Sequence, residues 1–300
     1  MFARAVCALL PVALVACAPV MVTQDTRPQA AAAALLDQCR DRDGWSDPAP
    51  PAQIFANVYQ IGTCGIVVLL VTSPAGHIVI DGAPADAAPS IARNIENLGF
   101  DLSDARFILN SHEHFDHAGG IAELQRLTGA VLVARREAKA ALETGLPDPS
   151  DPQSDHLMPF PGARVGQLIV DGETLSLGPL RLTAHATPGH SPGSTSWSWR
   201  SCDGAECHSI IYADSLSAIS ADSYRFSEHP DYVATFRASL DAIAAFDCDL
   251  LVTPHPAASN LYDRFAGGSA LIDRKACVDY AAGARRRLDT RLSDEAAPAG

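Results

Sequence analysis

The sequence has little positive charge, and this shortage argues against one large class of partner. Its 300 residues include 22 Lys and Arg against 35 Asp and Glu, a formal net charge of −13. Binding to a phosphate backbone requires a basic surface, and the basic run at 285–287 is only three arginines long. We therefore expect no nucleic-acid partner, and we expect the arginine run to solvate a final helix.

The sequence also lacks, near its N-terminus, an apolar run long enough to anchor it across a bilayer. The apolar stretch at 5–16 follows Arg4 and has the length of the apolar part of a secretory signal. This pattern predicts a signal peptide at 1–18 and export to a Gram-negative-type periplasm. Because Leu14-Val-Ala-Cys17 is similar to a bacterial lipobox, the alternative is a lipoprotein signal at 1–16, with Cys17 lipidated and anchored to the outer membrane.

The rest of the chain can form a folded domain. Hydrophobic residues make up 47% of the sequence, enough for a sizeable core. The alanine-rich, polar segment 19–35 is predicted to be a linker, and 36–300 a single domain without a short-period repeat. We expect this domain to be a monomer.

The apolar pattern predicts an α/β fold. Strand-like runs occur at 54–61, 66–72, 77–81, 106–109, 130–134, 167–170, 180–184, 195–200, 209–212 and 249–253. Helical spacing joins two further sets: Ile91, Ile95 and Leu98, and Val233, Phe236, Leu240 and Ile243. This order of strands and helices suggests two sheets packed face to face, with helices outside both.

One short run concentrates side chains that can bind a metal. Residues 110–117 read Asn-Ser-His-Glu-His-Phe-Asp-His. Imidazole nitrogens and a carboxylate oxygen suit zinc. Residues two apart on an extended segment point the same way, so His112 and His114 can bind one ion. Asp116 and His117, on the following turn, can reach a second. The alternative is a solvated polar loop, but the run lies between a strand-like stretch and a small-residue turn, which favours a metal site.

Two distant histidines have a similar setting. His190 lies in Thr-Pro-Gly-His-Ser-Pro-Gly and His255 in Thr-Pro-His-Pro, and each segment follows a strand-like run. Taken alone, either histidine is better explained by a core or surface role. Together with the first run, both are predicted to be metal ligands at strand ends.

These motifs resemble the metallo-β-lactamase superfamily, and specifically its subclass B3, over nearly all the chain after the leader. The resemblance implies an αββα sandwich, in which two mixed β-sheets lie face to face with helices on both outer faces. It also implies that subclass B1's second-site cysteine is absent, because Ser215 stands in that segment. The implied ligands of two zinc ions are His112, His114 and His190 for the first, and Asp116, His117 and His255 for the second.

The resemblance implies a dizinc β-lactamase that hydrolyses the amide bond of penicillins, cephalosporins and carbapenems and so confers resistance. Two zinc ions can share a water whose pKa falls to about 7, which makes hydroxide available as the nucleophile. Asp116 is the expected catalytic residue, because it would hold the second ion and orient the hydroxide. We find no Ser-x-x-Lys motif in a setting that would build an acyl-enzyme.

Three residues are expected to bind the substrate. Ser215 and Ser217 are similar to the hydroxyl residues of subclass B3 that bind the substrate carboxylate, although a plain strand-end turn is the alternative. Gln153 lies in the proline-rich segment 142–165, a long loop of the kind that is usually functional. His156, in the same loop, is expected at the pocket rim and not among the ligands.

Two other functions remain open. Glyoxalase II-like thioesterases and related lactonases share the fold and the first motif, and in them an Asp in this region bridges both metals; Asp214 could do so here. A non-catalytic zinc-binding protein of the periplasm would bind metal without turnover. The full second ligand set argues against this last class.

Eight cysteines are present, and two fall in the leader. An even remainder in an exported chain indicates disulfides, although sequence alone does not fix the connectivity. Cys202 and Cys207 flank a hairpin-like connection and should pair. The family resemblance suggests a pair between Cys248 and Cys277, which leaves Cys39 with Cys64.

Overall fold

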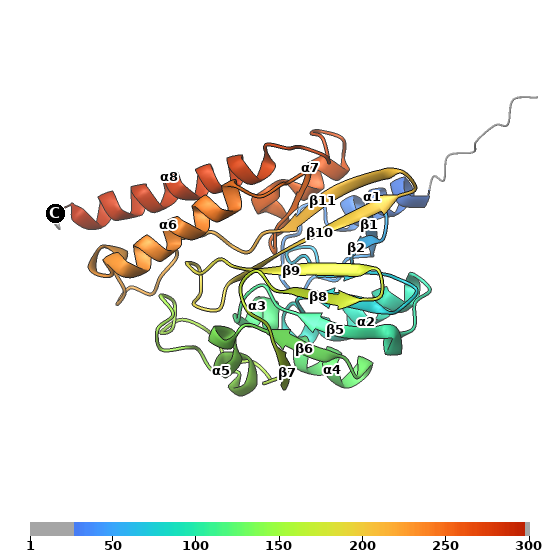
Figure 1. Cartoon of the computed structure of the whole chain (residues 1–300), viewed down its shortest axis with the longest axis horizontal. Helices are drawn as coiled ribbons and strands as arrows, with labels where there is room; N and C mark the ends of the chain where they lie inside the picture. Colours follow the sequence, from blue (N-terminus) through green and yellow to red (C-terminus); the bar gives the residue numbers. More distant parts are fainter. Residues whose placement is uncertain (1–26, 298–300) are drawn as a thin grey trace, which may run out of the picture.

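Two mixed β-sheets pack face to face in the computed structural model, which describes residues 27–297 (Figure 1). The first sheet has seven strands in chain order: β1 (Ala52–Phe55), β2 (Val58–Gln60), β3 (Leu69–Val71), β4 (His77–Ile80), β5 (Ala105–Leu109), β6 (Val131–Ala134) and β7 (Val165–Leu168). The second has five, in the order β12 (Leu250–Val252), β11 (Glu206–Tyr212), β10 (Thr195–Asp203), β9 (Leu180–Ala186) and β8 (Thr174–Leu177). The pairs β4–β5, β5–β6, β6–β7 and β11–β12 are parallel, and the other pairs are antiparallel.

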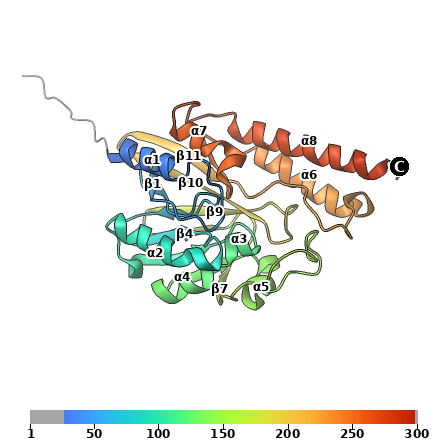
Figure 2. The same ribbon diagram turned by 180° about the vertical axis from the view of Figure 1, so that it is seen from behind.

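Helices cover both outer faces, as the resemblance implied. On the first sheet lie α2 (Ala88–Asn97) and α4 (Ile121–Thr128), and on the second α6 (Pro230–Ala244) and α8 (Ala276–Ala296), which pack against each other (Figure 2). The remaining helices of the described residues are α1 (Arg27–Gln38), α3 (Phe115–Ala118), α5 (Arg136–Thr144), α7 (Leu261–Phe265), η1 (Ala85–Ala87), η2 (Leu102–Asp104), η3 (Phe226–Glu228) and η4 (Pro256–Ser259).

The alternation of side chains along each strand builds three apolar layers. On β3, Leu69 and Val71 face the second sheet, whereas Leu70 faces the helices of the first. Trp197 of β10 is fully buried between the sheets, and Phe236 of α6 is fully buried on the outer side of the second sheet. Burial of each such aliphatic or aromatic side chain contributes about 1.5–3 kcal/mol to the stability of the fold. The two sheets are therefore stable, and they hold the loops at their edge in place.

Two element predictions need correction. Residues 54–61 form two strands of a hairpin and not one strand, because Ala56 takes a left-handed φ of +47° between β1 and β2. The expected linker at 19–35 was wrong for residues 27–35, which belong to helix α1. Alanine favours helix, and Leu35 is fully buried against Cys39 and Cys64, so this end of the helix is part of the domain.

The predicted signal peptide, with Cys17, lies outside the described residues. Within 27–297, no helix combines the length and the apolar character that crossing a membrane would require.

Three disulfides are present, and their pairs are those predicted. Cys39–Cys64 joins the end of α1 to the first sheet, Cys202–Cys207 closes the β10–β11 hairpin, and Cys248–Cys277 joins the start of β12 to α8. The Cys202–Cys207 and Cys248–Cys277 bridges therefore stabilise the second sheet and the helix α8 that covers it.

Candidate metal centre

All six expected ligands lie where strands end at one edge of the sandwich. His112 and His114 follow β5, and Asp116 and His117 lie on the single turn of α3. His190 lies in the connection between β9 and β10, and His255 follows β12. Strand ends are firmly held by their sheets, so these loops present their side chains from a rigid support.

The first group consists of His112, His114 and His190. One nitrogen from each ring lies within 4.8 Å of the other two, and all three residues are buried. Their ring centroids are 4.6, 4.7 and 4.9 Å apart. Burial and the neighbouring histidines lower the pKa of His112 and of His190, which keeps these rings neutral, as metal ligands must be.

Hydrogen bonds fix which nitrogen of His112 faces the group. Its Nδ1 lies 2.7 Å from Oδ1 of Asp214. Its Nε2 is buried and has no hydrogen-bond partner. A buried polar atom without a partner is costly, and a metal ion would satisfy it.

The other two histidines are oriented in the same way. Nε2 of His114 lies 2.8 Å from Oδ2 of Asp151, which leaves its Nδ1 for the group. Nδ1 of His190 lies 2.8 Å from Oγ of Ser217, which leaves its Nε2. Each ring thus has one nitrogen held by an oxygen and one free, the usual arrangement around protein-bound metals.

The second group consists of Asp116, His117 and His255. Oδ2 of Asp116 lies 3.1 Å from Nε2 of His117 and 3.5 Å from Nε2 of His255, and these two nitrogens are 3.2 Å apart. Tetrahedral zinc with bonds of about 2.0–2.1 Å places its ligands roughly 3.3 Å apart. The triangle therefore fits one ion of this size.

Charge supports the same assignment. Burial alone would raise the pKa of Asp116, but the charges and hydrogen bonds of His117 and His255 hold it well below its usual range. Burial would lower the pKa of His117, but the carboxylates of Asp116 and Asp81 raise it to about 10. The protein thus places a carboxylate and a cation together, and a metal ion can replace the proton that His117 holds.

The two groups are adjacent. The ring centroids of His112 and His117 are 4.2 Å apart, and donor atoms of His112, Asp116 and His117 also lie within 4.8 Å of one another. A pair of ions held by these groups would therefore be close neighbours.

Three buried carboxylates that we did not predict support the ligands. Asp81 follows β4 and accepts hydrogen bonds from the amide and hydroxyl of Ser111 and from the hydroxyl of Tyr212, and its Oδ2 lies 3.6 Å from Nδ1 of His117. Asp151 holds His114. Only the position of Asp81 directly after a buried strand could have signalled such a role.

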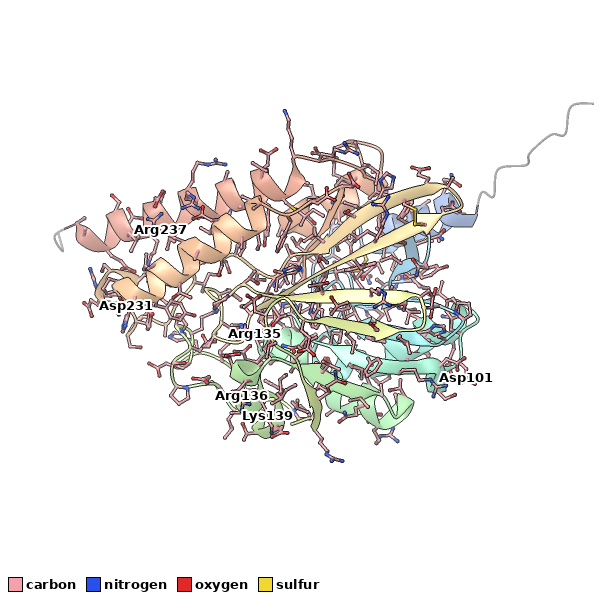
Figure 3. The ribbon with its side chains drawn as sticks, viewed as in Figure 1. Asp101, Arg135, Arg136, Lys139, Asp231 and Arg237 are labelled. Atoms are coloured by element: carbon pink, nitrogen blue, oxygen red, sulfur yellow. A yellow bond between two sulfur atoms is a disulfide. The ribbon has the colours of Figure 1, made fainter. Side chains whose placement is uncertain are left out.

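The third carboxylate, Glu113, braces the connection that carries His190. It accepts hydrogen bonds from the amide of Gly193 at 2.7 Å and the hydroxyl of Ser191 at 2.9 Å. Burial raises the pKa of Glu113 to about 7. Arg135, labelled in Figure 3 beside α5, donates to the carbonyl of Ser194 at 3.0 Å and holds the same connection from the other side.

The expected substrate-binding residues lie beside the first group. Ser217 and Gln153 are partly exposed and Ser215 is buried. Both the hydroxyl oxygen and the carbonyl oxygen of Ser217 lie near Nδ1 of His190, at 2.8 and 3.1 Å, so Ser217 holds this ring nitrogen. Nε2 of Gln153 lies 3.5 Å from the carbonyl of His190. A cavity of about 330 Å³ lies against His255 and Trp45.

The remaining histidines lie apart from both groups. His156 is exposed in the 145–164 connection, which contains neither helix nor strand. The others pack on aromatic rings or bond to polar side chains: His77 against Phe100, His185 to Ser198, His208 to Glu206 and His229 against Tyr224.

The chain belongs to the metallo-β-lactamase superfamily, whose model matches residues 61–255. Among solved structures, it is similar to the metallo-β-lactamase MIM-1 from Novosphingobium pentaromativorans: 51% identity, a TM-score of 0.87, and 89% of this chain and 99% of that one covered. It is also similar to MEM-A1, a subclass B3 enzyme from a soil metagenome library, with 44% identity, a TM-score of 0.81, and 84% and 99% covered. Within the superfamily, these likenesses and the donor set place the chain with subclass B3, as predicted.

A more distant likeness joins the chain to a hydroxyacylglutathione hydrolase of Bradyrhizobium sp. (strain ORS 278). The two are 29% identical over 121 residues, which are 40% of this chain and 38% of that protein. The chain thus matches less than half the length of this curated relative.

Proposed function

We propose that this protein is a dizinc β-lactamase that hydrolyses the amide bond of penicillins, cephalosporins and carbapenems and so confers resistance to them. One observation carries the proposal: six donors from three distant segments form two adjacent groups, His112–His114–His190 and Asp116–His117–His255. The likeness to MIM-1 over 99% of its length supports the choice of substrate class.

The donor sets fit zinc. They contain five imidazoles and one carboxylate, without a thiolate, and borderline-soft zinc accepts both kinds of donor. When bound, the two ions would supply a water molecule that ionises near neutral pH and a Lewis acid for the lactam carbonyl.

The residues around the groups have separate tasks. Asp116 is ionised, since its pKa is held well below its usual range, so its carboxylate can accept a hydrogen bond from the attacking water and orient it. Asp214 and Asp151 keep the rings of His112 and His114 in the tautomers that leave one nitrogen free. No side chain needs to form a covalent bond with the substrate.

The substrate carboxylate is proposed to bind at Ser215 and Ser217, with Gln153 at the same wall. The hydroxyl of Ser217 can donate to a carboxylate while it accepts from Nδ1 of His190. The hydroxyl of Ser217 would then contact both the substrate carboxylate and His190. A bound substrate would therefore help to hold the His190 ring in its metal-binding orientation.

A thioesterase or lactonase activity is the second candidate, supported by the partial match to a hydroxyacylglutathione hydrolase. It would require Asp214 to bridge both ions. Oδ1 of Asp214 instead lies 2.7 Å from Nδ1 of His112, and among the described residues Asp214 belongs to neither group of potential metal ligands. We therefore favour the β-lactamase. Export to the periplasm, lipidation at Cys17 and a monomeric state are part of the same proposal.

Turnover by the purified protein tests the proposal. We expect hydrolysis of imipenem and of a chromogenic cephalosporin, loss of both activities on treatment with a chelator, and recovery on addition of zinc. The thioester S-lactoylglutathione and an acyl homoserine lactone serve as competing substrates. Turnover of either one without β-lactam hydrolysis would overturn the assignment, and metal binding without any turnover would indicate a zinc-binding protein. An intact mass of the mature protein tests lipidation.

A further inference from the structure

We propose that Asp151 is a positioning residue that selects the metal-binding tautomer of His114 and couples the 145–164 connection to the first histidine group. The inference depends on the metal-binding part of the proposed function and not on the substrate. It assigns to this connection a part in building the metal site, in addition to its expected place beside the cleft.

The two carboxylate oxygens of Asp151 have different partners, one in its own loop and one in the metal site. Oδ1 accepts the amide of Gln153 at 2.7 Å, and Oδ2 lies 2.8 Å from Nε2 of His114. The amide of Asp151 itself donates to the carbonyl of Asp148 at 3.0 Å. Asp151 is 2% exposed and His114 is 3% exposed, so water does not compete for this contact.

Both oxygens of Asp151 are acceptors, and this decides which nitrogen of His114 carries hydrogen. Because Nε2 donates to Oδ2, Nδ1 has its lone pair free toward His112 and His190. The loop therefore makes His114 a metal ligand through Nδ1.

An amide in place of the carboxylate cannot bond to both partners and also leave Nδ1 of His114 free for the metal. If its oxygen faces His114, its NH₂ faces the amide N–H of Gln153, and two donors meet. If its NH₂ faces His114, Nε2 must accept, so the hydrogen moves to Nδ1 and blocks the metal. The first orientation loses the buried hydrogen bond to Gln153, and the second keeps both hydrogen bonds but loses the metal ligand.

Residues 151–153 also bond to other segments around the site. The carbonyl of Pro152 accepts the amide of Ala221 at 2.8 Å, and the side chain of Gln153 approaches His190. Residues 151–153 therefore link His114, His190 and the segment after Ser217. Occupation of the first group should order this connection, and loss of the ion should loosen it.

Zinc affinity of Asp151→Asn tests the assignment. We expect one of the two ions to bind roughly 10- to 100-fold more weakly than in the wild type, as is usual when a carboxylate behind a ligating histidine is lost. The visible absorption of the Co²⁺-substituted protein should change for the same ion. Asp148→Asn is the matched control, because Asp148 lies in the same loop and, among residues 27–297, its side chain accepts hydrogen bonds only from Ser150. Wild-type zinc affinity and an unchanged Co²⁺ spectrum in Asp151→Asn would overturn the inference.

Amide exchange in the wild-type protein provides a test that needs no variant. Removal of zinc with a chelator should speed exchange at the amides of Asp151, of residues 153–156 and of Ala221 more than at residues 175–182, the end of the β8–β9 hairpin away from His190. Equal effects in the two regions would refute the coupling. Because neither measurement uses a β-lactam, a failure of the proposed substrate class would not alter these results.

Discussion

The glycine before His190 offers a sharp test of how the fold positions the first metal group. Gly189 has a φ of +155°, and a Cβ at this position would lie 2.2 Å from Cδ2 of Phe236, a fully buried ring. A side chain in a glycine-only conformation costs about 1–3 kcal/mol, and overpacking of a core costs about 1–3 kcal/mol more. We expect Gly189→Ala to lower the free energy of unfolding by roughly 4 kcal/mol, a large part of the ~5–15 kcal/mol typical of a domain.

Urea denaturation of the metal-free protein measures this loss, and chelator competition measures zinc affinity, which should fall because His190 is displaced. Gly172→Ala is the matched control: its φ is +76°, and its Cβ would meet nothing within 4 Å, so only the backbone cost of about 1–2 kcal/mol applies. Phe236→Leu should recover part of the loss in Gly189→Ala, because it removes the overlap. If Gly189→Ala is no less stable than Gly172→Ala, the argument from packing is refuted.

Three further outcomes are expected. His255→Ala should bind one zinc ion in place of two, measured by native mass spectrometry; two tightly held ions would contradict the second group. Cys248→Ala/Cys277→Ala should lose roughly 3.6 kcal/mol in urea denaturation, since the disulfide closes a loop with a sequence separation of 29; a loss below about 1 kcal/mol would show that the bridge does little. Glu113 has a pKa raised by burial from 4.5 to about 7, so its contribution to stability is full below pH 4.5 and is lost as the pH rises through 7. The metal-free Glu113→Gln protein should lack this decline of up to roughly 3 kcal/mol, and parallel pH profiles of urea stability would argue against it.

The sequence predicted the sandwich and the set of potential ligands because both depend on local patterns. Strand runs, their Pro and Gly boundaries, and histidines directly after strands are all visible in short windows. His190 and His255 were noticed because each follows a strand-like run, and they became predicted ligands only together with the 110–117 run. The family resemblance then grouped them into two sets, and the structure brings together the members of each.

The supporting carboxylates could not be predicted, because their roles depend on tertiary contacts. Asp151 meets His114 across 37 positions, and Asp81 meets Ser111 across 30. No spacing rule relates such pairs. The start of α1 was missed for a related reason: an alanine-rich segment is a poor indicator of burial, and the packing of Leu35 depends on where Cys64 lies in the fold.

The ligands' spread along the chain has a consequence for how the protein matures. The first group needs His190 and the second needs His255, and both sheets must be paired before either residue meets the 112–117 run. A chain still being synthesised can offer only some of the ligands of each ion. Metal capture must therefore wait until almost the whole polypeptide has folded, so the ions are acquired in the compartment where folding is completed.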